Sequence, residues 1–507
     1  MKNIKYLSIL FGFIAFIACN EPEDVLIGTN IEPEAVVELP ALTAGSANFA
    51  TFVSLGNSLT AGFSDGTLFK ASQEKSFPSI LAQQFSLLGG GSFSQPLMND
   101  NFGGLALGGN RLPGFNPRLV TTGGAPLGLE SVIGPVTVTT DIALNNPTGP
   151  FNNMGVPGAR SFHLLAPGYG NIGNLSAGLA NPYFVRMTGT TPNASIIELS
   201  MAQSPTFFTL WAGNNDVLGY ATSGGDGTSP ITDKPTFDFA ISTLITTLTS
   251  SGAKGVVANI PYVTDIPHFT TVPHNPVPLD AGTAAFLNSA SAYGAYNAGI
   301  QSLVGVPPVN LTQEEADSRM INFTAGEGNA VVIMDESLSN MTIYSPALLS
   351  MRQATANDLL VLTASSFIGT EAVPGNSATV NGVAIPLADK WVLTPEEQLE
   401  IKTAVDEFNA TIEAAANSAG LAFVDANALL SQLATTGIAS DNFILTSNLV
   451  TGGAFSLDGV HLTSRGYAMA ANEFMKAIDA TYGSNFEASG NLVDIGTYPT
   501  NYSPLLP

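Results

Sequence analysis

The chain has 507 residues, of which 45% are hydrophobic and only 11% are charged, so it is long and apolar enough to bury a large core. Its 40 acidic residues outnumber its 16 basic residues and give a net charge of −24 at pH 7. A surface of this charge repels phosphate backbones, which argues against nucleic acid as a partner.

The N-terminus has the pattern of a secretion signal. Lys2 and Lys5 precede an apolar run over 7–17, which is too short to span a membrane comfortably. The run leads to Cys19, the single cysteine of the chain, and this arrangement resembles a bacterial lipoprotein signal. We therefore expect residues 1–18 to be a removed signal peptide and Cys19 to carry a lipid that anchors the protein at the outer membrane or cell surface. An ordinary signal peptide with an incidental cysteine is the alternative.

Residues 19–50 are rich in proline and glutamate and predict a flexible tether with little core. An acidic run directly after Cys19 resembles the surface-export signal of some bacterial lipoproteins. With no second cysteine, no disulfide can form within the mature chain.

From residue 51 onward, strand patterns alternate with helix patterns. The predicted strands are at 51–56, 205–211, 252–261 and 421–426, and the predicted helices start at Ser58 or cover 77–85, 194–200, 237–250, 394–418 and 464–482. Such alternation indicates an α/β sandwich around a mainly parallel sheet.

Two long segments do not follow this pattern. Residues 89–149 are rich in glycine, proline, leucine and asparagine, and residues 268–389 show weak periodicity. We interpret both as insertions in one domain over 51–480, followed by a C-terminal tail over 481–507.

Ser58 follows a predicted strand and opens a predicted helix. In a parallel sheet, ligands bind at the carboxyl ends of the strands, and a helix N-terminus favours negative charge. This is a suitable place for a nucleophile whose attack creates an oxyanion, although serine is also a common N-cap residue. A hydroxyl nucleophile needs a base and a carboxylate that orients the base. Asp458 and His461, three residues apart ahead of a predicted helix, can supply both, and the chain has only 4 histidines.

Two further loops offer donors for an oxyanion hole. Gly158 lies in "NMGVPGA" and Asn215 in "WAGNNDV", each in a loop predicted near a strand end. With the backbone N–H of Ser58, the Gly158 N–H and the Asn215 amide can converge on one oxygen. Ordinary turn roles for Gly158 and Asn215 are the alternative.

Together, four sequence blocks resemble the SGNH (GDSL-type) hydrolase family, in the order that the family has them. They are Gly56-Asn57-Ser58-Leu59, Asn153 to Gly158, Gly213-Asn214-Asn215-Asp216 and Asp458-Gly459-Val460-His461. The resemblance covers about 51–267 and 390–480. It implies a three-layer α/β/α sandwich with a parallel sheet of about five strands.

The resemblance also implies roles for individual residues. Ser58 would be the nucleophile, His461 the base and Asp458 its orienting partner. The oxyanion hole would combine the Ser58 and Gly158 amides with Asn215, and neither a metal nor a cofactor would be needed. The family usually has aspartate where this chain has Asn57, and a short polar side chain that binds loop amides would serve there structurally.

We therefore expect a serine esterase or lipase that acts on small-molecule or lipid esters through an acyl-enzyme on Ser58. The apolar segment 89–149 suggests a lid or an acyl-binding wall. The alternatives are a carbohydrate O-acetylesterase and a non-catalytic surface protein that binds a partner on a hydrolase scaffold. His268 and His274 have no third ligand at a recognisable spacing, so a proline-rich loop is favoured over a metal site there.

Overall fold

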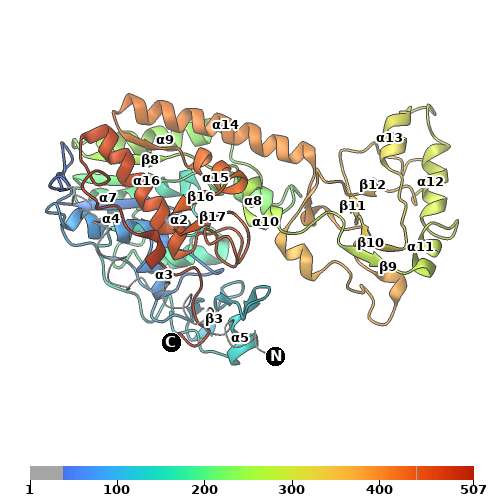
Figure 1. Cartoon of the computed structure of the whole chain (residues 1–507), viewed down its shortest axis with the longest axis horizontal. Coiled ribbons are helices and arrows are strands. Elements are labelled where there is room, and N and C mark those ends of the chain that lie inside the picture. Colours follow the sequence, from blue (N-terminus) through green and yellow to red (C-terminus); the bar gives the residue numbers. More distant parts are fainter. Residues whose placement is uncertain (1–37, 441, 507) are drawn as a thin grey trace, which may run out of the picture.

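A computed structural model describes residues 38–440 and 442–506. The expected signal peptide 1–18, Cys19 and most of the expected tether lie outside these residues. The chain forms a sheet body (residues 51–267 and 390–482) and a smaller inserted lobe (residues 268–389), which stands to one side of the body (Figure 1). None of the helices in the two described ranges combines the length and apolarity needed to cross a membrane.

The sheet body is built on five parallel strands. Their spatial order is β6 (Asn153–Gly155), β1 (Phe52–Gly56), β7 (Phe207–Trp211), β8 (Lys254–Ala258) and β15 (Ala422–Val424). β1 and β7 are buried along their whole length, as expected for strands covered on both faces. The predicted mainly parallel α/β sheet is thus confirmed.

The chain moves from β1 to β6 on one side, and then to β7, β8 and β15 on the other. This reversal of direction makes a topological switch point beside β1. Ligands of open α/β sheets bind in the crevice outside such a point, at the carboxyl ends of the strands. The loops that follow β1, β6 and β7 therefore meet where a ligand is expected.

Most predicted helices are present, and the strongest local signals gave the best boundaries. The principal helices of the body are α2 (Ser58–Ala61), α4 (Phe77–Ser86), α7 (Ile196–Met201), α8 (Asn215–Thr222), α9 (Lys234–Thr249), α14 (Pro395–Ser418), α15 (Ala426–Thr435) and α16 (Ser464–Tyr482). α9 begins three residues earlier than expected, because the Asp233 side chain caps it by accepting from the Thr236 N–H.

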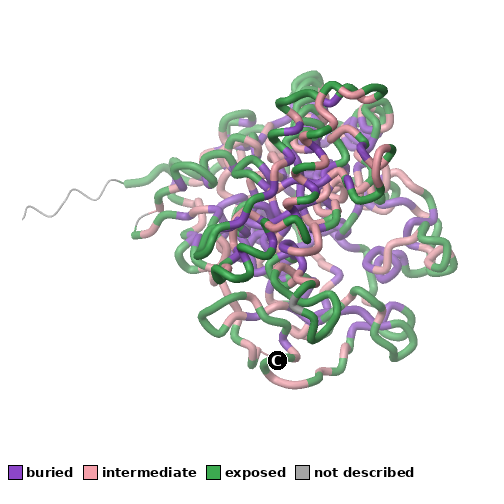
Figure 2. The backbone as a smooth tube through the Cα atoms, turned by 90° about the vertical axis from the view of Figure 1, so that its right-hand side faces the viewer, coloured by how far each residue is buried: buried purple, intermediate pink, exposed green. Residues whose placement is uncertain are grey.

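The helices of the body pack in two groups against the sheet. α4 packs on α16, where Phe77 and Phe474 stack with ring centroids 4.8 Å apart. α7, α9 and α14 pack together, and Phe237 stacks on Phe408 at 3.9 Å. Both groups belong to one continuous core, and buried segments gather in the interior of the body (Figure 2). This arrangement is compatible with a three-layer sandwich.

The segment 89–149 contains little regular structure. It has the short strands β2 (Ala106–Leu107), β3 (Asn110–Arg111), β4 (Leu119–Val120) and β5 (Leu127–Gly128), and the helix α5 (Leu129–Ile133). Its fully buried Arg118 donates hydrogen bonds to the carbonyls of Asn101 and Ser503, and so joins the segment to the C-terminal part of the chain.

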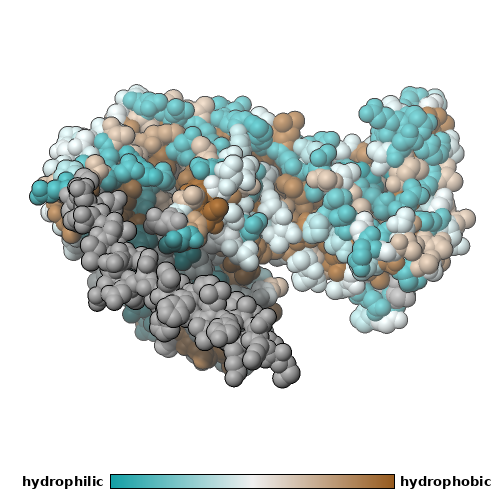
Figure 3. Space-filling model, viewed as in Figure 1, coloured by the Kyte–Doolittle hydropathy of each residue, from teal (hydrophilic) through white to brown (hydrophobic). Residues whose placement is uncertain are grey.

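The inserted lobe has its own hydrophobic core. Its elements are β9 (Val277–Leu279), α11 (Ala281–Leu287), α12 (Tyr293–Gln301), α13 (Gln313–Ser318), β10 (Gly326–Asn329), β11 (Val332–Met334), β12 (Met351–Gln353) and β13 (Leu359–Leu360). β13 pairs antiparallel with β14 (Val392–Leu393), after which α14 leads from the lobe back over the body (Figure 1). Hydrophilic and apolar residues alternate along the upper edge of the molecule, where α14 lies (Figure 3), and Leu399 of this helix is exposed.

Both ends of the described chain pack more closely than the sequence suggests. The Thr43 N–H donates to Asn485 Oδ1, the Ser46 N–H donates to the Tyr482 carbonyl, and Phe49 is buried against Phe85. The tether predicted over 19–50 therefore ends earlier than expected, because residues from Thr43 onward pack on the body. The tail expected over 481–507 is also packed on the body, since the Tyr502 hydroxyl lies 2.6 Å from Ser464 Oγ.

Candidate active site

The structure brings Ser58 together with His461 and Asp458, although Ser58 and His461 lie 403 residues apart in the chain. His461 Nε2 is 2.9 Å from Ser58 Oγ, and His461 Nδ1 is 2.8 Å from Asp458 Oδ2. The three side chains thus form one series of hydrogen bonds. This is the arrangement in which a histidine takes the proton of a serine while a carboxylate fixes the histidine tautomer.

Asp458 is held by donors on both of its carboxylate oxygens. Oδ1 accepts from the N–H groups of Val460 and His461, and Oδ2 accepts from the Gly66 N–H at 2.8 Å. Burial by itself would raise the pKa of Asp458, but the charge on His461 and these hydrogen bonds lower it well below its usual range. Asp458 is consequently ionised and able to stabilise a protonated His461.

The corner that carries Ser58 depends on two glycines. A Cβ atom on Gly56 would lie 2.2 Å from Thr60 Oγ1, and a Cβ on Gly155 would lie 2.3 Å from the Ala61 nitrogen. These close approaches let α2 begin directly at the end of β1 and pack against β6. Ser58 therefore stands at the carboxyl end of a central strand and at a helix N-terminus.

Asn57 has a structural role at this corner. Its Oδ1 accepts from the Leu59 N–H at 3.0 Å and so caps α2, and its Nδ2 donates to Asn214 Oδ1 at 2.9 Å. Asn57 thus joins the Ser58 corner to the loop after β7. An aspartate could make the cap but could not donate to Asn214, which explains how asparagine suits this position.

The loops with Gly158 and Asn215 are hydrogen-bonded to each other. Asn215 Nδ2 donates to the Ala159 carbonyl at 2.9 Å, and the Asp216 carboxylate accepts from both the N–H and the hydroxyl of Ser161 at 2.8 Å. Asp216 therefore anchors this loop to the loop that contains Gly158. The Asn215 amide has a second N–H, which remains available for a ligand.

Gly158 lies in the loop after β6 with φ of +79°, a left-handed conformation that favours glycine. Within the described ranges, neither the Gly158 N–H nor the Ser58 N–H has a hydrogen-bond acceptor. Both amides are thus available to bind an anion, together with the Asn215 side chain.

A supporting network around Asp458 was missed by the sequence analysis. Ser456 Oγ lies 3.1 Å from Asp458 Oδ1 and accepts from the Asp65 N–H. Burial raises the pKa of Asp65 to about 7, and its Oδ1 accepts from the Leu457 N–H. In the sequence, the only signal for this network is the Asp65-Gly66 dipeptide, which predicts a turn just after α2 but does not indicate its contact with residues 456–458.

An apolar pocket opens beside Ser58 and His461. Asn215 also lines it, together with Asn57, Asn214 and the apolar residues Leu59, Trp211, Leu218, Pro261, Val263, Ile266, Ala426, Leu429, Leu430, Leu433, Phe455, Val460, Leu462, Met469 and Ala470. None of these residues belongs to 89–149, so the segment expected to form a lid or an acyl-binding wall does not line this pocket, whose apolar wall comes largely from α15 and residues 261–266.

The remaining histidines have other surroundings. His163 Nδ1 accepts from the Arg160 N–H, and burial together with the Arg160 charge lowers the pKa of His163 to about 4. His268 is buried and donates its backbone N–H to the Gly459 carbonyl. Across residues 38–440 and 442–506, neither His268 nor His274 belongs to a group of three potential metal ligands.

Comparisons of the chain with protein-family models, with curated proteins and with solved structures found no match.

Proposed function

We propose that this protein is a serine hydrolase with an SGNH-type site that cleaves carboxylic esters. The observation that carries the proposal is the series of hydrogen bonds from Ser58 through His461 to Asp458, at 2.9 Å and 2.8 Å. A nucleophile, a base and an orienting carboxylate in contact are the minimum set for acyl transfer.

The reaction follows from these positions. His461 Nε2 takes the proton of Ser58 as Oγ attacks the ester carbonyl, and Asp458 stabilises the resulting imidazolium. The N–H groups of Ser58 and Gly158 and the Asn215 amide donate to the oxyanion. The alcohol leaves with the proton from His461, and a water activated by the same ring then releases the acid from Ser58.

The apolar pocket supports an ester with an apolar acyl group. Nearly all of its side chains other than those of the reacting corner are aliphatic or aromatic, and each methylene transferred from water into such a pocket contributes about 0.8 kcal/mol. Esterase or lipase activity on such acyl groups is therefore favoured over removal of acetyl groups from carbohydrates.

The test is hydrolysis of p-nitrophenyl acetate, butyrate and palmitate by the full chain and by Ser58→Ala, with Ser86→Ala as the matched control. Ser86 is exposed at the end of α4, so its loss should leave the rate unchanged. We expect Ser58→Ala to abolish turnover and labelling by a fluorophosphonate. Absence of both in the unmodified chain would refute the proposal and favour a binding protein on this scaffold, and activity confined to acetate would favour the O-acetylesterase.

We also propose that the enzyme is anchored outside the cytoplasm by lipid on Cys19. The support is the sequence pattern described above. Metabolic labelling with a fatty acid should mark the full chain and not Cys19→Ser. Equal labelling of both would refute the anchor without affecting the proposed chemistry.

A further inference from the structure

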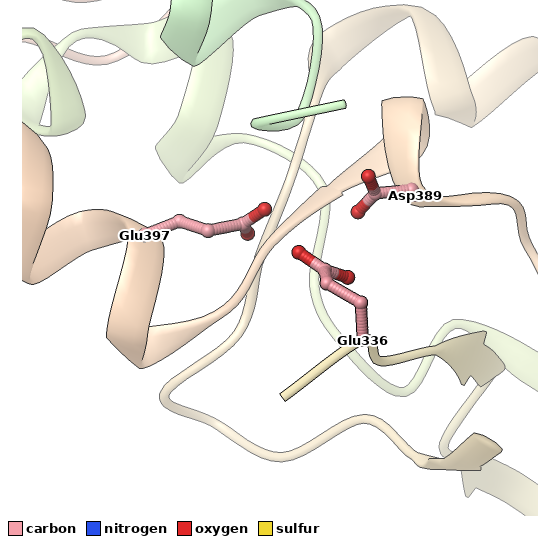
Figure 4. Close-up of side chains that lie close together, drawn as sticks. All are labelled: Glu336, Asp389 and Glu397. Carbon is pink, nitrogen blue, oxygen red and sulfur yellow. The ribbon is translucent and has the colours of Figure 1, made fainter. Parts of the chain in front are cut away.

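Three carboxylates meet where the inserted lobe joins the sheet body (Figure 4). Glu336 follows β11, Asp389 opens a short 3₁₀ helix (Asp389–Trp391), and Glu397 lies in the first turn of α14. One carboxylate oxygen of each residue lies within 4.8 Å of the other two. Residues from the lobe and from the body thus point at one common position.

Glu397 is the most informative member of this cluster, because its side chain is only 4% exposed. Its Oε2 accepts from the N–H and the hydroxyl of Thr394 and completes the capping box of α14. Among the described residues, its buried Oε1 has no hydrogen-bond partner, and Asp389 Oδ1 is also buried without one. A buried acceptor oxygen without a partner is costly, so these two oxygens call for a ligand.

The surrounding side chains offer no cationic partner to this cluster. In the ranges that the structure describes, no ion pair involves Glu336, Asp389 or Glu397. Lys390 is adjacent in sequence, but its ammonium group lies over the ring of Trp391, 5.1 Å from the centroid.

We propose that Glu336, Asp389 and Glu397 bind one hard divalent cation, and that this cation is Ca²⁺. Oxygen donors without nitrogen or sulfur suit Ca²⁺ and Mg²⁺ and not Zn²⁺. Ca²⁺ tolerates irregular geometry and can be held by protein carboxylates, whereas Mg²⁺ requires a near-regular octahedron, keeps several waters and is usually bound through one or two carboxylates. Three carboxylates from separate elements therefore favour Ca²⁺.

The loop after α8 closes one side of this site. Gly225 has φ of +74°, and a Cβ atom there would lie 2.0 Å from Glu397 Oε1. Only a glycine lets the backbone approach the carboxylate this closely. The cation therefore connects the lobe to the start of α14, beside the loop that follows α8. It fixes the lobe to the body and does not take part in the proposed ester hydrolysis.

The experiment is calorimetric titration of the chelator-treated full chain with CaCl₂ and, separately, MgCl₂, with thermal unfolding measured at each concentration. We expect saturable Ca²⁺ binding at one site, weaker Mg²⁺ binding and an unfolding temperature that rises with Ca²⁺. Glu336→Gln should weaken Ca²⁺ binding about tenfold or more, because the charge of the ligands sets the affinity. Without the cation, this variant should unfold at a temperature no lower than that of the unmodified chain, because losing the Glu336 charge relieves its repulsion with Asp389 and Glu397.

Glu413→Gln is the matched control, because Glu413 is exposed on α14, lies outside the cluster and makes the same change of charge. It should bind Ca²⁺ like the unmodified chain. The proposal is overturned if the unmodified chain shows no saturable binding of Ca²⁺, or if Glu336→Gln and Asp389→Asn both bind it with unchanged affinity. Calorimetric titration and thermal unfolding do not depend on ester turnover, so a negative result for Ca²⁺ binding would leave the proposed hydrolase activity untouched.

Discussion

Replacing Asp458 by asparagine tests the proposed site most directly, because the structure determines how an amide would fit. Oδ1 of Asp458 faces three donors, namely Ser456 Oγ and the N–H groups of Val460 and His461. Oδ2 faces only two groups, the Gly66 N–H and His461 Nδ1. The single oxygen of asparagine should take the first position, which leaves its NH₂ group at the second.

This orientation reverses the tautomer of the histidine. An NH₂ group can only donate to His461 Nδ1, so the ring proton must move to Nε2, which then cannot accept the proton of Ser58. A serine hydrolase whose histidine is held in the wrong tautomer loses about 10⁴-fold in kcat, and we expect a loss of about 10³- to 10⁴-fold here. The NH₂ group also opposes the Gly66 N–H, which should cost about 1–3 kcal/mol of stability for a buried donor without an acceptor.

The assay is the kcat of p-nitrophenyl butyrate hydrolysis, with the rate of fluorophosphonate labelling as a second readout. Asp494→Asn is the control, since Asp494 is exposed and its Oδ1 accepts one N–H that asparagine can also accept. Circular dichroism shows whether the variants are folded. A folded Asp458→Asn protein whose kcat stays within about tenfold of the unmodified chain would refute the assigned role of Asp458.

Three further changes probe the oxyanion loop, the pocket and the buried Asp65. Gly158→Ala should lower kcat about tenfold. An alanine has room there, since its Cβ would meet no atom closer than 3.8 Å, but φ of +79° costs it about 1–2 kcal/mol and so favours a backbone shift that moves the residue-158 N–H out of position. An unchanged kcat would exclude this loop from the reaction. Leu429→Trp should narrow the pocket and lower the ratio of kcat/KM for palmitate to kcat/KM for acetate by about tenfold. Leu399→Trp, at an exposed position outside the pocket, should leave this ratio unchanged. Burial raises the pKa of Asp65 to about 7, so between about pH 4 and 7 its carboxyl is protonated in the folded state and ionised in the unfolded state. The free energy of unfolding should therefore fall as pH rises through this range, by at most about 4 kcal/mol. Asp65→Asn should reduce this dependence and leave the part contributed by Asp389 and Glu397, as denaturant unfolding at pH 4 and pH 8 will show. An unchanged dependence would mean that Asp65 is ionised at little cost.

Elements with strong local signals could be predicted closely. The capping box of Thr394 and Glu397 marks the start of α14, and α16 has the bounds that its apolar periodicity indicates. β6 was missed because its three residues, Asn153 to Gly155, show neither apolar alternation nor high strand propensity. Its pairing with β1 positions it, and such a contact between distant segments leaves little trace in local sequence.

Within the candidate site, the sequence by itself determined which residue types are present and the order of their blocks. Ser58, Asp458, His461, Gly158 and Asn215 could each be named as candidates, because their sequence blocks resemble those of a hydrolase family. Only the tertiary structure decided that Ser58, His461 and Asp458 meet, that Asn57 joins two loops through Asn214, and that α15 and not residues 89–149 forms the apolar wall of the pocket. The physical reason is that hydrogen bonds and packing between segments far apart in the chain depend on how the sheet orders its strands, and short sequence patterns do not encode that order.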